Sequence, residues 1–192
     1  MGDVNQVIYL QTFMPTVSGP VLEVGSKDHG NTASFRDFYA SQEYVGIDME
    51  PGAGVDMVLD LTQGVAGLPK EYFALAICCS VLEHVRKPWV FAEHLTSLVR
   101  PGGTLFMSVP WVWRYHPYPD DYFRFSWRGI IELFPAFTWS EICYATNLQD
   151  ELFDLDPRNP GIDDAMAVMT PNGRKHLPYL MISMLGQKAM AG

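Results

Sequence analysis

Apolar runs alternate with stretches of helical spacing over most of the chain. Five runs have the length and composition of strands: residues 21–24, 44–48, 55–61, 73–80 and 104–109. Residues 3–13, 32–40 and 88–99 instead repeat their apolar positions at near-helical spacing. Pro88 stands where proline best opens a helix. Strands that alternate with helices indicate an α/β fold with a mostly parallel sheet, and the nearly continuous apolar run 73–80 fits its centre.

The same alternation continues toward the C-terminus. Ser126 is a good N-cap for a following helix, and residues 137–145 and 179–185 have the pattern of strands. There is no internal repeat and no composition shift that marks a domain boundary. We therefore expect a single domain over residues 1–192, with residues 1–19 as an N-terminal helical segment.

Two longer stretches fit neither a helix nor a strand. Residues 110–126 are rich in aromatic side chains but interrupted by prolines and paired acids, so we expect a loop over the carboxyl ends of the strands, where open α/β sheets bind ligands. Residues 147–177 are acidic and then rich in proline and asparagine, with a short helix expected at 161–169. A loop this long is usually functional or disordered, and we expect a second acceptor-side loop. Residues 62–71 predict a turn in place of a crossover helix.

Acidic residues stand at the ends of three predicted strands. Glu23 lies two positions before Gly25, where the first strand breaks into a polar turn, and an acid there can accept hydrogen bonds from a cationic cofactor. Asp48 ends the second strand about 20 residues further on, where a carboxylate binds ribose hydroxyls or merely starts a turn. Asp60 closes the third strand. The turn at Gly25 has neither G-x-G-x-x-G nor G-K-[ST], which disfavours a standard dinucleotide site or P-loop.

Further along, the chain reads Ser80-Val81-Leu82-Glu83-His84-Val85, then a predicted helix, then Leu98-Val99-Arg100-Pro101-Gly102-Gly103-Thr104-Leu105. Together with Glu23-Val24-Gly25 and Tyr44-Val45-Gly46-Ile47-Asp48, this series resembles the type 11 group of class I S-adenosylmethionine-dependent methyltransferases, without the middle glycine of their first motif. The resemblance runs from about Pro20 to Arg128. It implies a Rossmann-like methyltransferase fold: a mostly parallel seven-stranded sheet with one antiparallel strand near the C-terminus and helices on both faces.

The resemblance also implies that the cofactor is S-adenosylmethionine. Its cofactor-binding positions correspond to Glu23, Gly25, Ser26, Asp48, Met49, Asp60, Leu61 and Ser80. In this layout Asp48 binds the ribose, Asp60 receives the adenine amino group and Leu61 packs on the adenine ring. A solvated strand-end carboxylate is the alternative for Asp60.

The aromatic loop supplies the catalytic candidates. His116, whose ordinary pKa is about 6.5, can remove a proton from an attacking hydroxyl or amine, and Asp120 or Asp121 can orient it or hydrogen-bond a polyol. His84 follows the fourth strand, where such folds bring the methyl group. The alternatives are a loop histidine held by backbone, an Asp–Arg pair that fixes the loop, and a structural histidine at a helix start.

The same loop supplies the candidates for binding the acceptor, which are aromatic or charged: Trp113, Arg114, Tyr115, Tyr118, Asp120, Tyr122 and Arg124. The two arginines can fix an acidic group on the acceptor. Residues 116–125 resemble a loop of methyltransferases associated with cell-surface sugar and lipopolysaccharide gene sets. That resemblance implies a small-molecule or sugar-like acceptor.

Composition and charge argue against several classes of binding partner. The formal charge of −9 and pI of about 4.9 argue against a protein that grips nucleic acid by its phosphates. No apolar run reaches the ~20 residues of a membrane span, and the first residues lack a secretory signal pattern, so we expect a cytosolic protein. Cys78 and Cys79 are adjacent and point to opposite faces of a strand, so no metal site is expected. The oligomeric state stays open.

We therefore predict a methyltransferase that acts on O or N of a small-molecule or sugar-like acceptor. Cys79-Ser80-Val81-Leu82 stands where an Asn-Pro-Pro-Tyr motif would mark methylation of a base or of glutamine. One alternative is a nicotinamide-dependent reductase or epimerase, for which the G-x-G-x-x-G and Tyr-x-x-x-Lys patterns are missing. The other is a non-catalytic relative that binds a cofactor or a partner, and the acids Glu23 and Asp48 count against loss of cofactor binding.

Overall fold

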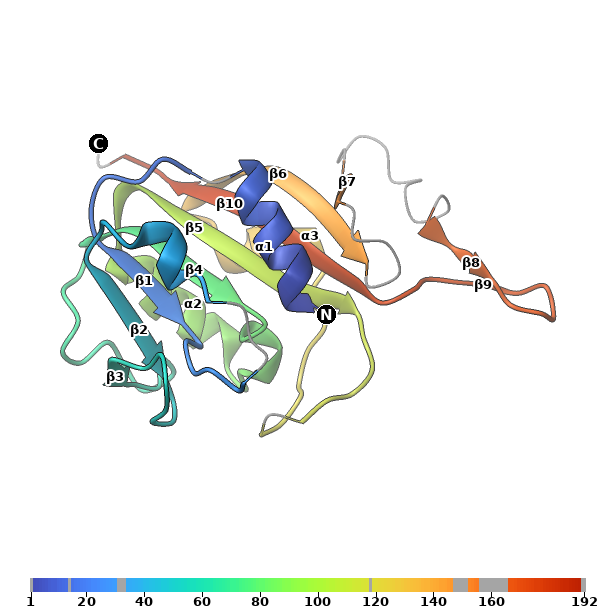
Figure 1. Ribbon diagram of the computed structural model, residues 1–192, viewed down its shortest axis with the longest axis horizontal. Helices are drawn as coiled ribbons and strands as arrows, with labels where there is room; N and C mark the ends of the chain where they lie inside the picture. The colour runs from blue at the N-terminus through green and yellow to red at the C-terminus, as the bar shows by residue number, and fades with distance from the viewer. Residues whose placement is uncertain are drawn as a thin grey trace.

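The computed structural model describes residues 2–13, 15–30, 34–117, 119–146, 152–155 and 166–190 (Figure 1). Its centre is one eight-stranded sheet, whose strands are, in order across the sheet, β3 (Met57–Val58), β2 (Tyr44–Asp48), β1 (Val21–Val24), β4 (Phe73–Cys79), β5 (Val99–Val112), β10 (Leu180–Lys188), β6 (Phe137–Thr146) and β7 (Leu152–Asp154). A separate hairpin of β8 (Val168–Met169) and β9 (Lys175–His176) extends beyond the end of this sheet (Figure 1). The helical elements are α1 (Gly2–Phe13), α2 (Pro88–Leu98), α3 (Trp127–Leu133) and the 3-10 turns η1 (Arg36–Tyr39) and η2 (Leu82–His84).

Strand direction confirms the Rossmann-like fold class, with a different strand count. Strands β3, β2, β1, β4 and β5 are parallel, while β10 runs antiparallel between β5 and β6 as predicted. The eighth strand, β7, pairs antiparallel with β6 over Cys143–Ala145 and lies within residues 147–177, where the sequence predicted only a loop. A strand of three residues is too short to show a period in the sequence, and β7 covers backbone groups of β6 that would otherwise lie at an open edge.

Helices cover both faces of the sheet, as expected (Figure 1). One face packs against α1 and η1 through Tyr9, Phe35 and Tyr39. The other packs against α2 and α3. Within β1, Val21 belongs to the first cluster and Leu22 to the second, because successive strand residues point to opposite faces. The sheet therefore has a buried core on each side.

Local signals predicted several element boundaries correctly. Pro88 opens α2 at its first turn, and the Ser126 hydroxyl accepts a hydrogen bond from the Gly129 N–H (3.1 Å) at the start of α3. Residues 62–71 form turns without a helix. The fifth strand is longer than residues 104–109, because it begins directly after α2 and absorbs a register shift near Gly102 (φ +69°).

Three predicted elements are shorter than expected or only partly described. The strand predicted at 55–61 is reduced to β3, because the Asp56 side chain accepts the Gly46 N–H (2.7 Å) that a strand carbonyl would otherwise take. The helix predicted at 32–40 is the 3-10 turn η1, since the chain must reach β2 within four residues of its end, and residues 31–33 lie outside the described part. In the stretch 161–169, residues 161–165 also lie outside it, and Val168–Met169 form β8 rather than a helix.

Candidate active site

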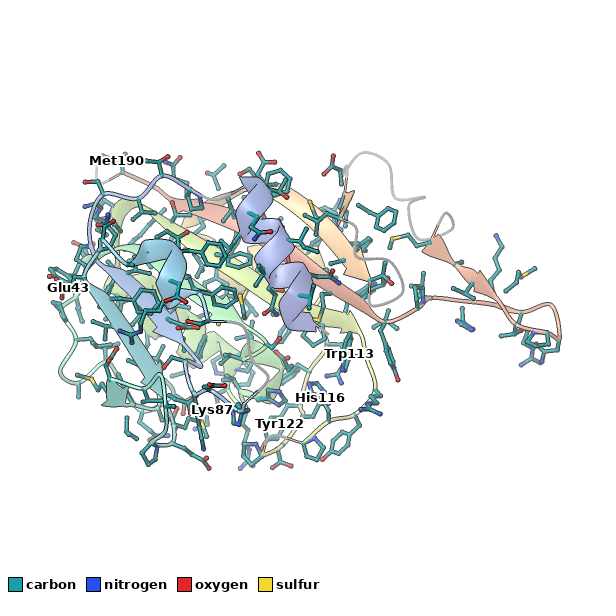
Figure 2. All side chains as sticks on the ribbon, in the orientation of Figure 1. Glu43, Lys87, Trp113, His116, Tyr122 and Met190 are labelled. Atoms are coloured by element: carbon teal, nitrogen blue, oxygen red, sulfur yellow. The ribbon has the colours of Figure 1, made fainter. Side chains whose placement is uncertain are left out.

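A cavity of about 1520 Å³ opens at the carboxyl ends of β1, β2 and β4. Register explains its place, because Glu23 of β1 pairs with Gly46 of β2 and Ile77 of β4, so these parallel strands end side by side. All eight predicted cofactor-binding residues line it, and so do His84, His116, Trp113 and Tyr122 from the acceptor side. Figure 2 shows Trp113, His116 and Tyr122 together in the loop that follows β5. The geometry thus joins the two predicted halves of the site in one cavity.

The turn after β1 requires a glycine at position 25. Gly25 has a left-handed φ of +78°, and a Cβ there would lie 2.3 Å from Cγ2 of Val81. Its N–H and that of Ser26 both donate to the Ile47 carbonyl (2.9 and 3.1 Å), which ties the turn to β2. The close approach to Val81 brings the β1 and β4 sides of the cavity together, and a side chain at position 25 would separate them.

Glu23 lies within β1, two residues before the turn at Gly25, and lines the cavity. Its carboxylate accepts a hydrogen bond from the Tyr44 hydroxyl (2.7 Å). Burial raises the pKa of Glu23 to about 7, and the Tyr44 bond and the Arg36 charge only partly offset that effect. A cation bound in the cavity would favour the ionised form of this carboxylate.

Asp48 and Asp60 accept hydrogen bonds from the loops at the strand ends. Asp48 accepts from the N–H groups of Lys27 (3.3 Å) and Glu50 (3.0 Å), so one carboxylate connects the turns after β1 and β2. Asp60 accepts from the N–H (2.8 Å) and hydroxyl (2.9 Å) of Thr62. Each carboxylate oxygen carries more than one acceptor site, so both acids retain capacity for a ligand that donates hydrogen bonds.

Apolar and strained residues complete this half of the cavity. Met49 follows Asp48 and is 53% exposed, an unusual position for methionine, whereas Leu61 is buried. Ser80 has a φ of +55°, which is uncommon for a residue with a side chain. Its hydroxyl accepts a hydrogen bond from the Gln6 amide (2.9 Å), and Gln6 itself lines the cavity. Helix α1 therefore reaches the site.

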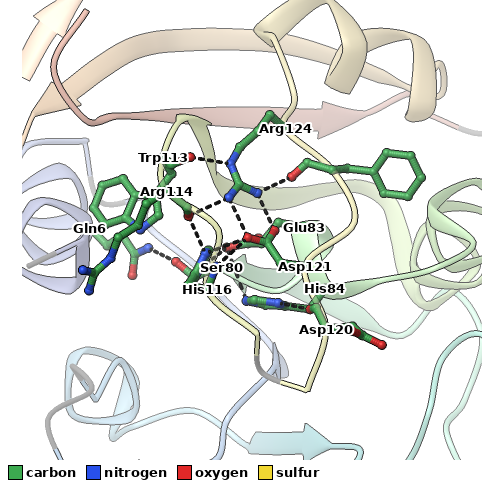
Figure 3. A network of polar contacts seen from close by, with 11 residues as sticks. Gln6, Ser80, Glu83, His84, Trp113, Arg114, His116, Asp120, Asp121 and Arg124 are labelled. Carbon is green, nitrogen blue, oxygen red and sulfur yellow. Dashed lines mark hydrogen bonds and ion pairs between the residues drawn. The ribbon is translucent and has the colours of Figure 1, made fainter.

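The loop after β5 is held by one arginine and one aspartate (Figure 3). The Arg124 guanidinium binds both carboxylate oxygens of Asp121 and donates to the carbonyls of Trp113, Arg114 and Phe123. This contact holds the pKa of Asp121 well below its usual range. Asp121 thus forms the Asp–Arg pair that fixes the loop, and its carboxylate also lies 3.0 Å from Nδ1 of His116, so it is placed to orient that ring as well. Arg124 is largely engaged within the loop, so it is poorly placed to fix an acceptor.

Glu83 joins this loop to the end of β4. Its backbone carbonyl accepts from the N–H groups of Tyr122 (2.8 Å) and Phe123 (3.2 Å). Its side chain is 1% exposed, and neither carboxylate oxygen has a hydrogen-bond partner among the described residues. Burial raises the pKa of Glu83 to about 8. The backbone of this residue therefore has a clear structural role, while its side chain does not.

His84 and His116 face Glu83 from two directions (Figure 3). Nδ1 of His84 lies 2.6 Å from the Asp120 carbonyl, and Nδ1 of His116 lies 3.0 Å from the Asp121 carboxylate. Both of these oxygens only accept, so each ring donates through Nδ1–H, and Nε2 carries the lone pair of the neutral ring. Burial lowers the pKa of His84, which favours its neutral form.

The remaining predicted acceptor residues are divided between the cavity and the outside of the loop. Trp113 packs against Tyr179 with ring centroids 4.8 Å apart. The Tyr122 hydroxyl donates to the Asp120 carboxylate (2.9 Å). Arg114 and Tyr115 are exposed and do not line the main cavity. Tyr118 lies outside the described residues, and none of the described residues of the stretch 147–177 lines the cavity, so its acceptor-side role stays a prediction.

The lining residues that were not singled out from the sequence include Gln6, Glu83, Arg86 and Lys87. A signal for Glu83 was present, since an acid directly after a buried strand and before a histidine is unusual. Gln6 had no such signal, because its partner Ser80 is 74 positions away. Arg86 and Lys87 are exposed at the cavity.

Comparison with known proteins identifies the family. A family model described as a methyltransferase domain matches residues 9–152. An uncharacterized methyltransferase of Mycobacterium leprae is 32% identical over 105 residues, a match that covers 49% of this chain and 38% of that relative. Among the described residues, no helix combines the length and apolar character needed to cross a membrane.

Solved structures share the fold across nearly the whole chain. A putative methyltransferase from Bacillus halodurans is 12% identical, with a TM-score of 0.62 over 96% of this chain and 98% of that one. A Burkholderia thailandensis 1,6-didemethyltoxoflavin-N1-methyltransferase bound to S-adenosylhomocysteine is 13% identical, with a TM-score of 0.59 over 97% and 76%. With the family match over most of the chain, the resemblance in the motifs is confirmed, and the chain belongs to the methyltransferase domain family, whose class I members use S-adenosylmethionine.

Proposed function

We propose that this protein transfers a methyl group to O or N of a small polar acceptor bound beneath the loop of residues 113–126. The observation that carries the proposal is the single cavity of about 1520 Å³, which is lined both by the strand-end acids and by the histidines of the acceptor side. Ligand pockets usually measure about 300–1,000 Å³, so this one has room for a cofactor and a second molecule.

The residues present fit S-adenosylmethionine. Gly25 leaves room where a Cβ would meet Val81, and Glu23 offers a carboxylate to a cation. Asp48 would bind the ribose hydroxyls, Asp60 the adenine amino group, and the apolar side chains of Met49 and Leu61 the faces of the ring. The bound cofactor supplies an electrophilic methyl group.

The chain's own contribution is to position the acceptor, exclude water and accept a proton. Asp121 fixes the ring of His116 through Nδ1, which leaves Nε2 as its basic atom on the cavity side. His116 is therefore the candidate that takes the proton from the attacking hydroxyl or amine. Trp113, whose ring centroid lies 4.8 Å from that of Tyr179 and 6.4 Å from that of His116, would form an apolar wall for the acceptor.

Two cations suggest which acceptors fit. The sequence predicted that Arg114 and Arg124 bind an acidic group, but Arg124 is engaged within the loop and Arg114 does not line the main cavity. Arg86 and Lys87 line the cavity and are exposed, so we assign the acidic-group role to them. Acceptors with a carboxylate or phosphate, including nucleotide sugars, are then favoured over neutral sugars.

A thermal-shift series tests the cofactor. S-adenosylmethionine and S-adenosylhomocysteine should each raise the melting temperature of the wild-type chain, because a ligand that binds only the folded state stabilises it. NAD at the same concentration should not. A shift with NAD alone would favour the reductase alternative, and no shift with any of the three would favour a relative that binds only a partner.

Methyl transfer from a labelled donor then tests the acceptor. The screen should pair acidic and neutral members of each class: sugar phosphates with sugars, nucleotide sugars with nucleosides, and small acids with their amides. Activity on the acidic members that weakens in an Arg86→Gln, Lys87→Gln double variant is the expected result. Equal activity on the neutral members would remove the role assigned to these two cations. The cytosolic location stays a prediction, which cell fractionation tests.

A further inference from the structure

The Glu83 carboxyl group is buried where no described residue offers it a hydrogen bond. It is 1% exposed and both oxygens lack a hydrogen-bond partner among the described residues. The nearest cationic side chain of the loop, Arg124, is bound to Asp121 instead. Burial of an unpaired carboxylate is strongly unfavourable, so such groups are normally paired or coordinate metals.

Two imidazole nitrogens lie beside this carboxylate. Nε2 of His84 is 3.8 Å and Nε2 of His116 is 3.9 Å from Oε1 of Glu83, and the two ring centroids are 4.9 Å apart. The residues come from η2 and from a loop 32 positions later, so only the fold brings the three together (Figure 3). One ligand atom from each residue lies within 4.8 Å of the others.

Both rings also have the outer contact that metal-binding histidines usually have. The far nitrogen of such a ring normally donates to a carboxylate or a backbone carbonyl, which fixes the tautomer and directs the other nitrogen at the ion. His116 has the carboxylate of Asp121 in that position, and His84 has the carbonyl of Asp120. Arg124 in turn fixes Asp121, so the outer partners are themselves held in place.

We propose that Glu83, His84 and His116 bind a divalent transition-metal ion. Two imidazoles and a carboxylate suit Zn²⁺, and with further open positions they also suit Fe²⁺. At ligand distances of about 2.0–2.2 Å, neighbouring ligand atoms lie roughly 3–3.5 Å apart. The two nitrogens at 3.8 and 3.9 Å from the carboxylate oxygen are close to this spacing, and ligand atoms that lie up to 4.8 Å apart must move closer by side-chain rotation. The buried carboxylate then gains the positive charge that it lacks.

The open positions of the ion face the cavity, since all three side chains line it. A hydroxyl or carboxylate oxygen of the acceptor could occupy these open positions. Binding of the acceptor by the ion rests on the proposed function, whereas metal binding itself does not. The ion and a proton compete for the same lone pair on Nε2 of His116. His116 therefore acts as the base only in the metal-free protein, and in the metal-bound protein it holds the ion.

Zinc titration of the full chain, freed of metals with a chelator and followed by calorimetry, tests the site. Wild type should bind one tight Zn²⁺ per chain. Glu83→Gln and His116→Gln should weaken this binding by more than the roughly 10–100-fold that loss of an outer partner costs. His176→Gln, which removes an exposed histidine on β9, should leave it unchanged. Thermal melts without zinc show whether each variant folds, and Glu83→Gln keeps the size of the side chain.

No tight zinc binding in wild type would overturn the proposal, and so would an unchanged affinity in folded Glu83→Gln and His116→Gln. Loss of binding in His176→Gln would also overturn it, because the zinc would then sit on the hairpin. Titration of the same proteins with S-adenosylhomocysteine separates this question from the proposed function. Intact S-adenosylhomocysteine binding without zinc binding rejects only the metal site, and the reverse rejects only the cofactor assignment.

Discussion

The two halves of the cavity use their charged residues differently. On the cofactor side, Glu23, Asp48 and Asp60 stand at or just beyond the ends of parallel strands and line the cavity. On the acceptor side, Asp121 and Arg124 bind each other and the backbone of their own loop. Strand geometry fixes where a strand-end side chain lies, whereas a loop side chain is directed by partners that its residue type does not reveal. The following predictions test whether this contrast is also a contrast in function.

The largest effect is expected on the acceptor side. His116→Gln should lower turnover by about 10²-fold or more, the contribution of a general base, while affinity for S-adenosylhomocysteine stays within a factor of about two. Steady-state rates with a true acceptor and calorimetry with the cofactor product measure the two quantities. His176→Gln serves as the matched control for loss of a histidine.

Chelation sharpens that result. If His116 acts as a base, wild type freed of metal keeps its turnover, and if it holds an ion, chelation lowers turnover as much as the substitution does. Unchanged turnover in His116→Gln, with or without chelator, would remove this residue from catalysis and erase the functional difference between the halves.

The second prediction concerns the fold of the cofactor side. Gly25→Ala should lower the free energy of unfolding by about 1–3 kcal/mol. The new Cβ would lie 2.3 Å from Val81, and alanine would have to adopt the positive φ of this position. Gly30→Ala is the control, since Gly30 has a φ of +86° but nothing within 4 Å of its added Cβ. Denaturant unfolding of both variants separates the contact from the backbone strain.

Val81→Ala should recover part of the stability lost in Gly25→Ala, because it removes the methyl group in the way. Equal losses of stability in Gly25→Ala and Gly30→Ala, with no recovery in the Gly25→Ala, Val81→Ala double variant, would contradict this explanation. The turn would then not depend on its close contact with Val81.

The third and smallest effect is on pH dependence. Burial raises the pKa of Glu23 to about 7 against the effects of Tyr44 and Arg36, with Asp56 adding a small rise. A bound cation favours the ionised carboxylate, so affinity for S-adenosylmethionine should increase as pH rises toward 7, by at most about tenfold per unit, and level off above it. Calorimetry measures this affinity between pH 5.5 and 8.5, about 1.5 pH units on each side of the Glu23 pKa.

Glu23→Gln should remove the part of the pH profile that Glu23 causes, and the same profile in both proteins would exclude its titration. Stability provides an independent sign check. A carboxyl group whose pKa is raised on folding stabilises the fold at low pH, and this contribution is lost as pH rises through about 7. Because this pKa rises from 4.5 to about 7 on folding, the cofactor-free wild type should lose stability between about pH 4.5 and 7 relative to Glu23→Gln and show little further change above that.

The sequence predicted what depends on local chemistry. Pro88 and Ser126 opened helices because their effects act within one turn, and Asp48 lay at the cavity because its strand ends there. It could not predict β7, a three-residue edge strand that exists only because β6 is beside it. The sequence also left the pairing between Asp121 and Arg124 open. This pairing depends on how the loop folds, and either side chain could equally have bound a ligand.

Glu83 shows where sequence reasoning stopped. The motif that contains it was recognised, but its burial depends on the packing of the loop after β5 over η2. The position of Glu83 beside His116 also depends on that loop. The three candidate metal ligands therefore do not form a motif with a recognisable spacing in the sequence. Residues that act through a fold-dependent neighbour can be found only once the fold is known.

The central claim, that the strand-end acids bind S-adenosylmethionine, is tested most directly by calorimetric titration of Asp48→Ala with S-adenosylhomocysteine. Charge-assisted hydrogen bonds are worth roughly 1.5–3 kcal/mol, so the affinity should fall by about ten- to a hundredfold. Asp48→Asn should lose less, because its carbonyl still accepts, and Glu93→Ala, which removes an exposed acid on α2, should lose nothing. Equal affinity in wild type and folded Asp48→Ala would contradict the account and place the cofactor site elsewhere.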